Sequence, residues 1–121
     1  MPLAVAPLID ALCILVFVML GRRNHAEGEA ASGVLRTAAP FLIGAAVAWA
    51  ASARLWRPPT SLRLGGAIWA GTLVIGMVLR RTAFDKGTAV SFIVVATVFL
   101  GLFLLGWRLV AGYLLRHRAV A

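Results

Sequence analysis

An acidic side chain interrupts the first apolar stretch, PLIDALCILVFVML, which spans residues 7–20. An ionised carboxylate inside a membrane is costly unless it gains a partner or a proton, so Asp10 requires a chemical role. A basic residue, Arg108, lies about seven residues before the end of the last apolar stretch, and Asp10 lies about seven residues after the start of the first. If these two ends face the same side of a membrane, both groups lie roughly 10 Å along their helices. We therefore predict an intramembrane ion pair between Asp10 and Arg108.

Two alternatives to a structural pair are open for these residues. In the first, Asp10 lies at the membrane interface, and the long side chain of Arg108 reaches the headgroups without it. In the second, the Asp10 carboxylate also takes up a proton or a cation, as intramembrane acids do in pumps and transporters.

A second group of polar residues lies at the opposite ends of the apolar stretches, in GRRNHAEGEAASG (21–33) and RRTAFDKGT (80–88). One interpretation is a solvated surface with internal ion pairs that anchors the chain among lipid headgroups. The other is a basic opening that binds an anionic solute or headgroup. The candidate binding residues in this group, called the basic rim below, are Arg22, His25, Glu27, Arg36, Arg80 and Arg81.

The sequence lacks the residue sets that catalysis or a cofactor would need. Cys13 is the single cysteine, so no intramolecular disulfide or cysteine-based zinc site can form. His25 and His117 fall on opposite sides of the membrane and cannot share one haem iron. No nucleophile elbow, phosphate-binding loop or dinucleotide fingerprint is present. We predict a protein that is not an enzyme, with no catalytic residues, no cofactor and no metal.

Composition indicates a membrane protein rather than a soluble domain. Of 121 residues, 62% are hydrophobic and only 13% are charged, against about a quarter charged in soluble domains. The net charge of +8 comes from arginines that flank the apolar stretches, where they would meet headgroups. No basic helix or aromatic–basic surface is left for nucleic acid, so we predict none as a partner.

Four apolar stretches, at residues 3–20, 34–53, 62–79 and 89–115, are each close to the length that spans a bilayer. Every backbone group must be satisfied in lipid, and the stretches do not alternate as barrel strands would, so we expect helices. Short connections between long helices predict an all-α, up-down-up-down bundle forming one integral membrane domain over residues 1–121. The last stretch is long enough that it must tilt or extend past the bilayer.

Small residues recur at helical spacing, as Gly44 with Ala48 and Ala67 with Gly71. Such pairs let helices approach closely in membranes. They fit either packing inside one chain or an interface between two copies, and the sequence leaves both open.

Three segments, LGRRNHAEG (20–28), GVLRTAAPFLIG (33–44) and GTAVSFIVVATVFLGLFLLGWR (87–108), carry a resemblance. Together they resemble a family of short four-helix integral membrane proteins of actinobacteria and haloarchaea, known as a domain of unknown function. The resemblance covers nearly the whole chain and implies a membrane protein of a GC-rich prokaryote, but no substrate. It implies that the positions to test are Asp10, Arg22, His25, Arg36 and Arg108.

Two functions are compatible with this pattern. The first is a small transporter or channel for an ion or small solute, working as a homo-oligomer in the prokaryotic plasma membrane. The alternative is a non-catalytic accessory or assembly subunit of a larger membrane complex. Both imply a lipid bilayer as partner, including anionic lipid. Basic residues are nearly balanced between the two sides, but Arg22 and Arg23 directly after the first span favour a cytoplasmic location for the loop between the first two spans.

Overall fold

The computed structural model describes residues 2–24, 31–83 and 90–120. These ranges contain α-helices and a short 3₁₀ helix, and no strand, so the all-α prediction is confirmed. Each of the four α-helices is long and apolar enough to cross a membrane. The elements are α1 (Val5–Asn24), α2 (Ala31–Ala51), the 3₁₀ helix η1 (Ala53–Leu55), α3 (Leu62–Arg81) and α4 (Val90–Val120).

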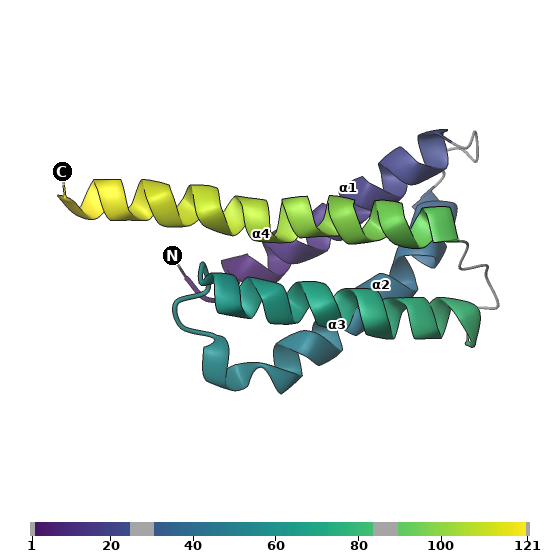
Figure 1. Cartoon of the computed structure of the whole chain (residues 1–121), viewed down its shortest axis with the longest axis horizontal. Coiled ribbons are helices and arrows are strands. Elements are labelled where there is room, and N and C mark those ends of the chain that lie inside the picture. The colour runs from purple at the N-terminus through teal and green to yellow at the C-terminus, as the bar shows by residue number, and fades with distance from the viewer. Residues whose placement is uncertain (1, 25–30, 84–89, 121) are drawn as a thin grey trace.

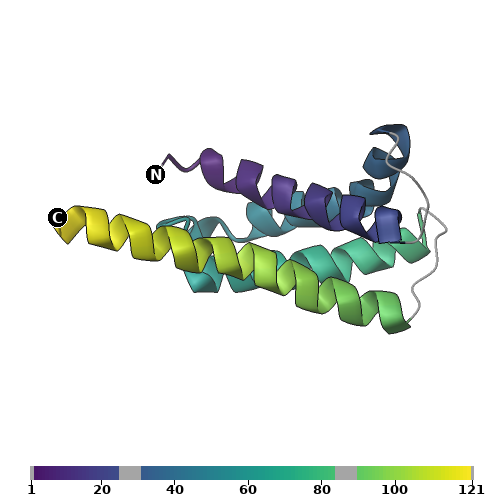
Figure 2. The same cartoon turned by 90° about the horizontal axis from the view of Figure 1, so that it is seen from above.

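The helices alternate in direction along the bundle, as expected (Figure 1). Both chain ends, the end of α2 and the start of α3 lie at one end of the bundle, which we call the terminal end. Figure 2 shows that α4 continues well past the other helices at this end. Around the bundle, α1 packs against α2 and α4, and α3 packs against α2 and α4. The α2–α3 interface is the most extensive of these, and the α1–α4 interface is the smallest.

Small residues account for the close contact of α2 with α3. A Cβ atom at Gly71 would lie 2.6 Å from the Cβ of Ala48, and one at Gly44 would lie 3.1 Å from the backbone N of Gly76. Side chains at these positions would force the two helices apart. Of the two explanations that the sequence left open, packing inside one chain accounts for Gly44, Ala48 and Gly71.

Aromatic side chains fill the bundle away from the terminal end. The ring of Phe17 on α1 lies 6.2 Å from Phe41, 6.2 Å from Phe92 and 5.7 Å from Phe99, between ring centroids. These separations are within the range of favourable ring–ring contacts. The four phenylalanines come from α1, α2 and α4, so this cluster joins three of the helices through their apolar faces.

The helix ends extend past the apolar stretches in several places. The first helix continues past Gly21 to Asn24, and α4 continues past Leu115 to Val120. The second helix runs through Pro40, which lies inside it. The side chain of Ser61 accepts a hydrogen bond from the backbone N–H of Leu64, so Ser61 caps α3. Thr88, whose type and position just before the last apolar stretch make it a candidate cap of α4, lies outside the described residues.

Candidate functional site: a buried Asp–Arg pair at the terminal end

The side chains of Asp10 and Arg108 are in direct contact, as their equal depth predicts. Arg108 Nη1 donates to Asp10 Oδ1 at 2.8 Å, and Arg108 Nη2 donates to Asp10 Oδ2 at 2.8 Å. This is a two-pronged guanidinium–carboxylate contact, the strongest geometry for such a pair. Each residue is only 1% exposed, so the pair is sealed inside the bundle. The pair joins α1 to α4, which share the smallest of the four main interfaces of the bundle.

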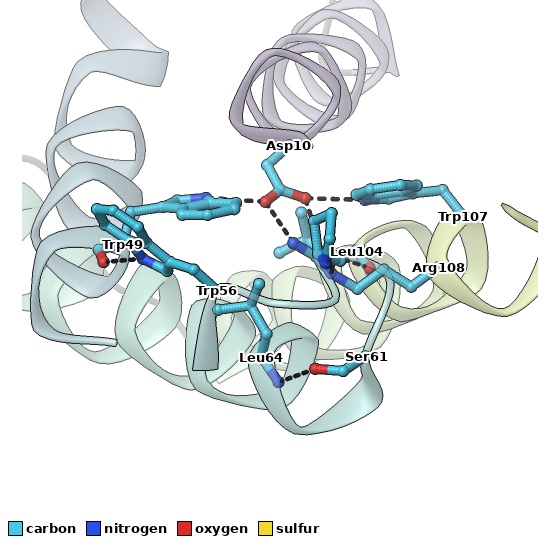
Figure 3. Close-up of polar contacts among 9 residues, drawn as sticks. Asp10, Trp49, Trp56, Ser61, Leu64, Leu104, Trp107 and Arg108 are labelled. Atoms are coloured by element: carbon cyan, nitrogen blue, oxygen red, sulfur yellow. Dashed lines mark hydrogen bonds and ion pairs between the residues drawn. The ribbon is translucent and has the colours of Figure 1, made fainter. Parts of the chain in front are cut away.

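Two indole groups complete the surroundings of the carboxylate (Figure 3). Trp49 Nε1, from α2, donates to Asp10 Oδ2 at 2.9 Å. Trp107 Nε1, from α4, donates to Asp10 Oδ1 at 2.8 Å, and the two indoles approach the carboxylate from opposite sides. Each carboxylate oxygen thus accepts one hydrogen bond from the guanidinium and one from an indole. The carboxylate is bound by two helices besides its own.

The guanidinium of Arg108 also donates hydrogen bonds to backbone carbonyl oxygens. Its Nε donates to the carbonyl oxygen of Pro59 at 3.1 Å, and its Nη1 donates to the carbonyl oxygen of Leu104 at 2.9 Å. The Arg108 Cζ lies 4.6 Å from the centroid of the Trp107 ring, a cation–π distance. The stem of Arg108 packs over Gly65 of α3, where a Cβ atom would lie 2.8 Å from Arg108 Cδ. We call Asp10, Trp49, Trp107, Arg108 and the Pro59 carbonyl the polar clasp.

The connection between α2 and α3 holds its part of the clasp in place. Trp56, just after η1, donates from Nε1 to the carbonyl oxygen of Trp49 at 2.8 Å. The rings of Trp49 and Trp56 are 6.1 Å apart between centroids. Ser61 then starts α3 two residues after Pro59, whose carbonyl accepts from Arg108. The clasp therefore fixes α1, α4 and the α2–α3 connection to one another.

The hydrogen bonding of the pair determines what it can do chemically. A carboxylate has about four acceptor positions, and Asp10 accepts four hydrogen bonds from Arg108, Trp49 and Trp107. A proton or a metal ion would have to displace one of these donors before it could bind the carboxylate. In the conformation observed, Asp10 is the acceptor of a saturated ion pair.

Residues of the basic rim lie at the end of the bundle opposite the clasp. Arg22 donates from Nη1 to Thr37 Oγ1 at 3.1 Å, which links α1 to α2. The Arg80 Cζ lies 4.3 Å from the centroid of the Phe92 ring, which links α3 to α4. Arg36 is exposed, as is Arg81, which lines a shallow groove between α3 and α4 with Met77, Val78, Thr82 and Ile93. His25 and Glu27 lie outside the described residues.

The two indole donors were missed by reasoning from the sequence. The type of Trp107 and its position near the end of the last apolar stretch indicate a lipid-interface anchor, since tryptophans gather at that interface. Its N–H points to Asp10 instead. The missed signal was a count of donors: one arginine fills only two of the four acceptor positions of a buried carboxylate, so further donors at the same depth were required. Trp107 is adjacent to Arg108 in the sequence, but nothing in the sequence singles out Trp49.

Replacing Trp107 by phenylalanine should lower the free energy of unfolding by about 1.5 kcal/mol through the lost hydrogen bond to a charged acceptor, in addition to the packing that the smaller phenyl ring loses. Trp49→Phe should act in the same way. Trp69→Phe is the matched control, since its Nε1 donates at 3.0 Å to an uncharged acceptor, the carbonyl oxygen of Thr97. The control loses the same part of the indole, but its lost hydrogen bond should contribute only about 0.5–1 kcal/mol. Denaturation in mixed micelles measures the free energy of unfolding of the three variants. If Trp69→Phe costs as much as Trp107→Phe, the charged acceptor Asp10 does not strengthen the indole hydrogen bond.

Comparison with known proteins identifies a family. Residues 7–111 match the family model described as protein of unknown function, DUF3054. Neither the curated proteins nor the solved structures gave a match. The matched range runs from just before Asp10 to just after Arg108, so it includes the whole polar clasp and most of the four apolar helices that fit a membrane-spanning protein. The chain therefore belongs to the DUF3054 family of proteins of unknown function.

Proposed function

We propose that the chain is a non-catalytic accessory or assembly subunit of a larger complex in the prokaryotic plasma membrane. In this role it contributes a rigid helical unit whose outer surface contacts lipid and other membrane-spanning chains. The observation that carries the proposal is the saturated hydrogen bonding of the polar clasp. A group that moves a solute or a proton must exchange its partners, whereas Asp10 has all of its acceptor positions filled by Arg108, Trp49 and Trp107.

Burial of the charges supports the same interpretation. A buried pair contributes little net stability, because desolvation offsets the attraction, but it can select one arrangement of helices over others. Here the pair joins α1 and α4 across the smallest of the four main interfaces, and Trp49 and the Pro59 carbonyl add the α2–α3 connection. The aromatic cluster around Phe17 fills the bundle farther from the terminal end. In the proposed role, the clasp and the aromatic cluster fix the shape of the bundle, and its outer surface contacts the other membrane-spanning chains.

A small transporter or channel is the second candidate, and one observation favours it. Ionisable residues inside a membrane are rare and are functional by default. Because α1 and α4 share the smallest of the four main interfaces and Asp10 and Arg108 bridge it, breaking the pair would let these helices separate at the terminal end. A transport cycle could use that opening in a homo-oligomer.

Native mass spectrometry of the tagged chain, taken from its own membrane at low expression, separates the two functions. We expect a complex of fixed stoichiometry with other membrane proteins. A pure homo-oligomer would contradict this proposal and favour transport. In that case, flux into proteoliposomes should be lost in Asp10→Asn and kept in Arg36→Gln, an exposed arginine at the opposite end. A lone monomer in the native membrane would contradict both functions.

A further inference from the structure

We propose that the terminal end of the bundle is a binding surface for anionic phospholipid headgroups. The surface consists of exposed arginines from the α2–α3 connection and from the extension of α4. Its members, called the terminal basic surface, are Arg54, Arg57, Arg63 and Arg116. This surface is distinct from the basic rim, which lies at the other end of the bundle.

The distribution of acidic residues carries the proposal. The chain has only four acidic residues, Asp10, Glu27, Glu29 and Asp85. Asp10 is the one acid within the part of the chain that the structure describes, and it is occupied by Arg108. The other three belong by sequence to the segments that join α1 to α2 and α3 to α4, which lie outside the described residues. Among the described residues, the clasp therefore uses the one acidic side chain, and no other described side chain carries a negative charge that could neutralise the terminal basic surface.

The positions of these arginines favour a lipid headgroup as the anion. Arg63 lies in the first turn of α3, and Arg54 and Arg57 lie in the short connection that precedes it. They are thus within a few residues of two membrane-spanning helices, at the depth where headgroup phosphates lie. A guanidinium can bond two phosphate oxygens at once.

The extension of α4 adds an apolar component to the same surface. Beyond Gly112, which lies beside Thr60 at the start of α3, the helix continues past the ends of the other helices (Figure 1). Tyr113 and Leu114 are exposed there, and the rings of Tyr113 and His117 are 4.1 Å apart between centroids. Aromatic, aliphatic and arginine side chains together are typical of helix segments at the membrane interface. The extension therefore fits a position among the headgroups, with Arg116 facing their phosphates.

The test measures which lipids the full chain retains. Protein in nanodiscs made from equal amounts of phosphatidylcholine and phosphatidylglycerol is released for native mass spectrometry, and the bound lipids are counted. We expect enrichment of phosphatidylglycerol in the wild type. In R54Q/R57Q/R63Q this enrichment should fall at least about tenfold, since each arginine near an anionic surface contributes roughly fivefold. The fold should survive, because these side chains are exposed and no acidic residue lies near them in the chain.

A matched variant keeps the proposal falsifiable. R54K/R57K/R63K keeps a positive charge at each of the three positions, and we expect it to keep most of the enrichment. If both triple variants lose it equally, or if R54Q/R57Q/R63Q changes it less than about twofold, the proposal is overturned. If R54Q/R57Q/R63Q does not fold, Arg57→Gln replaces it, with an expected loss of roughly fivefold. Inorganic phosphate added to the nanodiscs should not displace the lipid; displacement would instead assign the surface to soluble anions.

Discussion

Asp10→Ala and Arg108→Ala should each lower the free energy of unfolding by about 3–5 kcal/mol, because each leaves one buried charge without its partner. The two residues are 1% exposed and are joined by two hydrogen bonds of 2.8 Å. In Asp10→Ala the guanidinium loses two acceptors, and the indoles of Trp49 and Trp107 lose their shared acceptor. In Arg108→Ala the carboxylate keeps only the two indole donors. Reversible denaturation in mixed micelles, followed by circular dichroism, measures both losses.

The double variant Asp10→Ala/Arg108→Ala decides whether the two losses arise from one interaction. With both charges removed, no charge is left buried and unpaired, so we expect a cost below the sum of the single variants by about 2–3 kcal/mol. Arg63→Ala is the control, since Arg63 is exposed, and it should change the free energy of unfolding by less than about 0.5 kcal/mol. Additive losses from the two single variants would mean that Asp10 and Arg108 do not interact in the folded protein.

The fold could be predicted because the membrane limits the choices so strongly. Hydropathy and length locate the four helices, and short connections fix their alternating directions. The helix ends were less predictable for a physical reason: apolar residues show where the bilayer core ends, not where the backbone stops being helical. Arg22 and Arg116 are polar, yet both lie inside helices that continue for further residues. A glycine such as Gly21 also does not end a helix by itself.

The contact between Asp10 and Arg108 could be inferred because the two groups lie at equal depth and an unpaired charge facing lipid is costly. Equal depth lets the two side chains meet, and the cost of exposure to lipid favours rotations of α1 and α4 that turn both of them inward. The roles of Trp49 and the Pro59 carbonyl depend on how the helices rotate and on the path of the α2–α3 connection, which hydropathy does not encode. The basic rim was predicted as one group, but the contacts described for it link Arg22 to Thr37 and Arg80 to Phe92.

Gly71→Ala should lower the free energy of unfolding by about 2–3 kcal/mol, the upper part of the range for overpacking. A Cβ at this position would lie 2.6 Å from the Cβ of Ala48, which is fixed to the α2 backbone and cannot rotate away. The helices would have to separate at their most extensive interface. This would also shift α3 relative to α2, and with it the connection that carries Trp56 and Pro59. Denaturation in mixed micelles measures the loss.

Gly66→Ala, five residues earlier in α3, is the matched control because a Cβ there meets nothing within 4 Å. The control should be neutral or slightly stabilising, by up to about 1 kcal/mol, since alanine is the better helix former. The combination Gly71→Ala/Ala48→Gly should recover most of the loss, because it removes the methyl group that the new side chain would meet. Equal losses from Gly66→Ala and Gly71→Ala, or no recovery in the combination, would show that contact between α2 and α3 does not explain the need for glycine at this position.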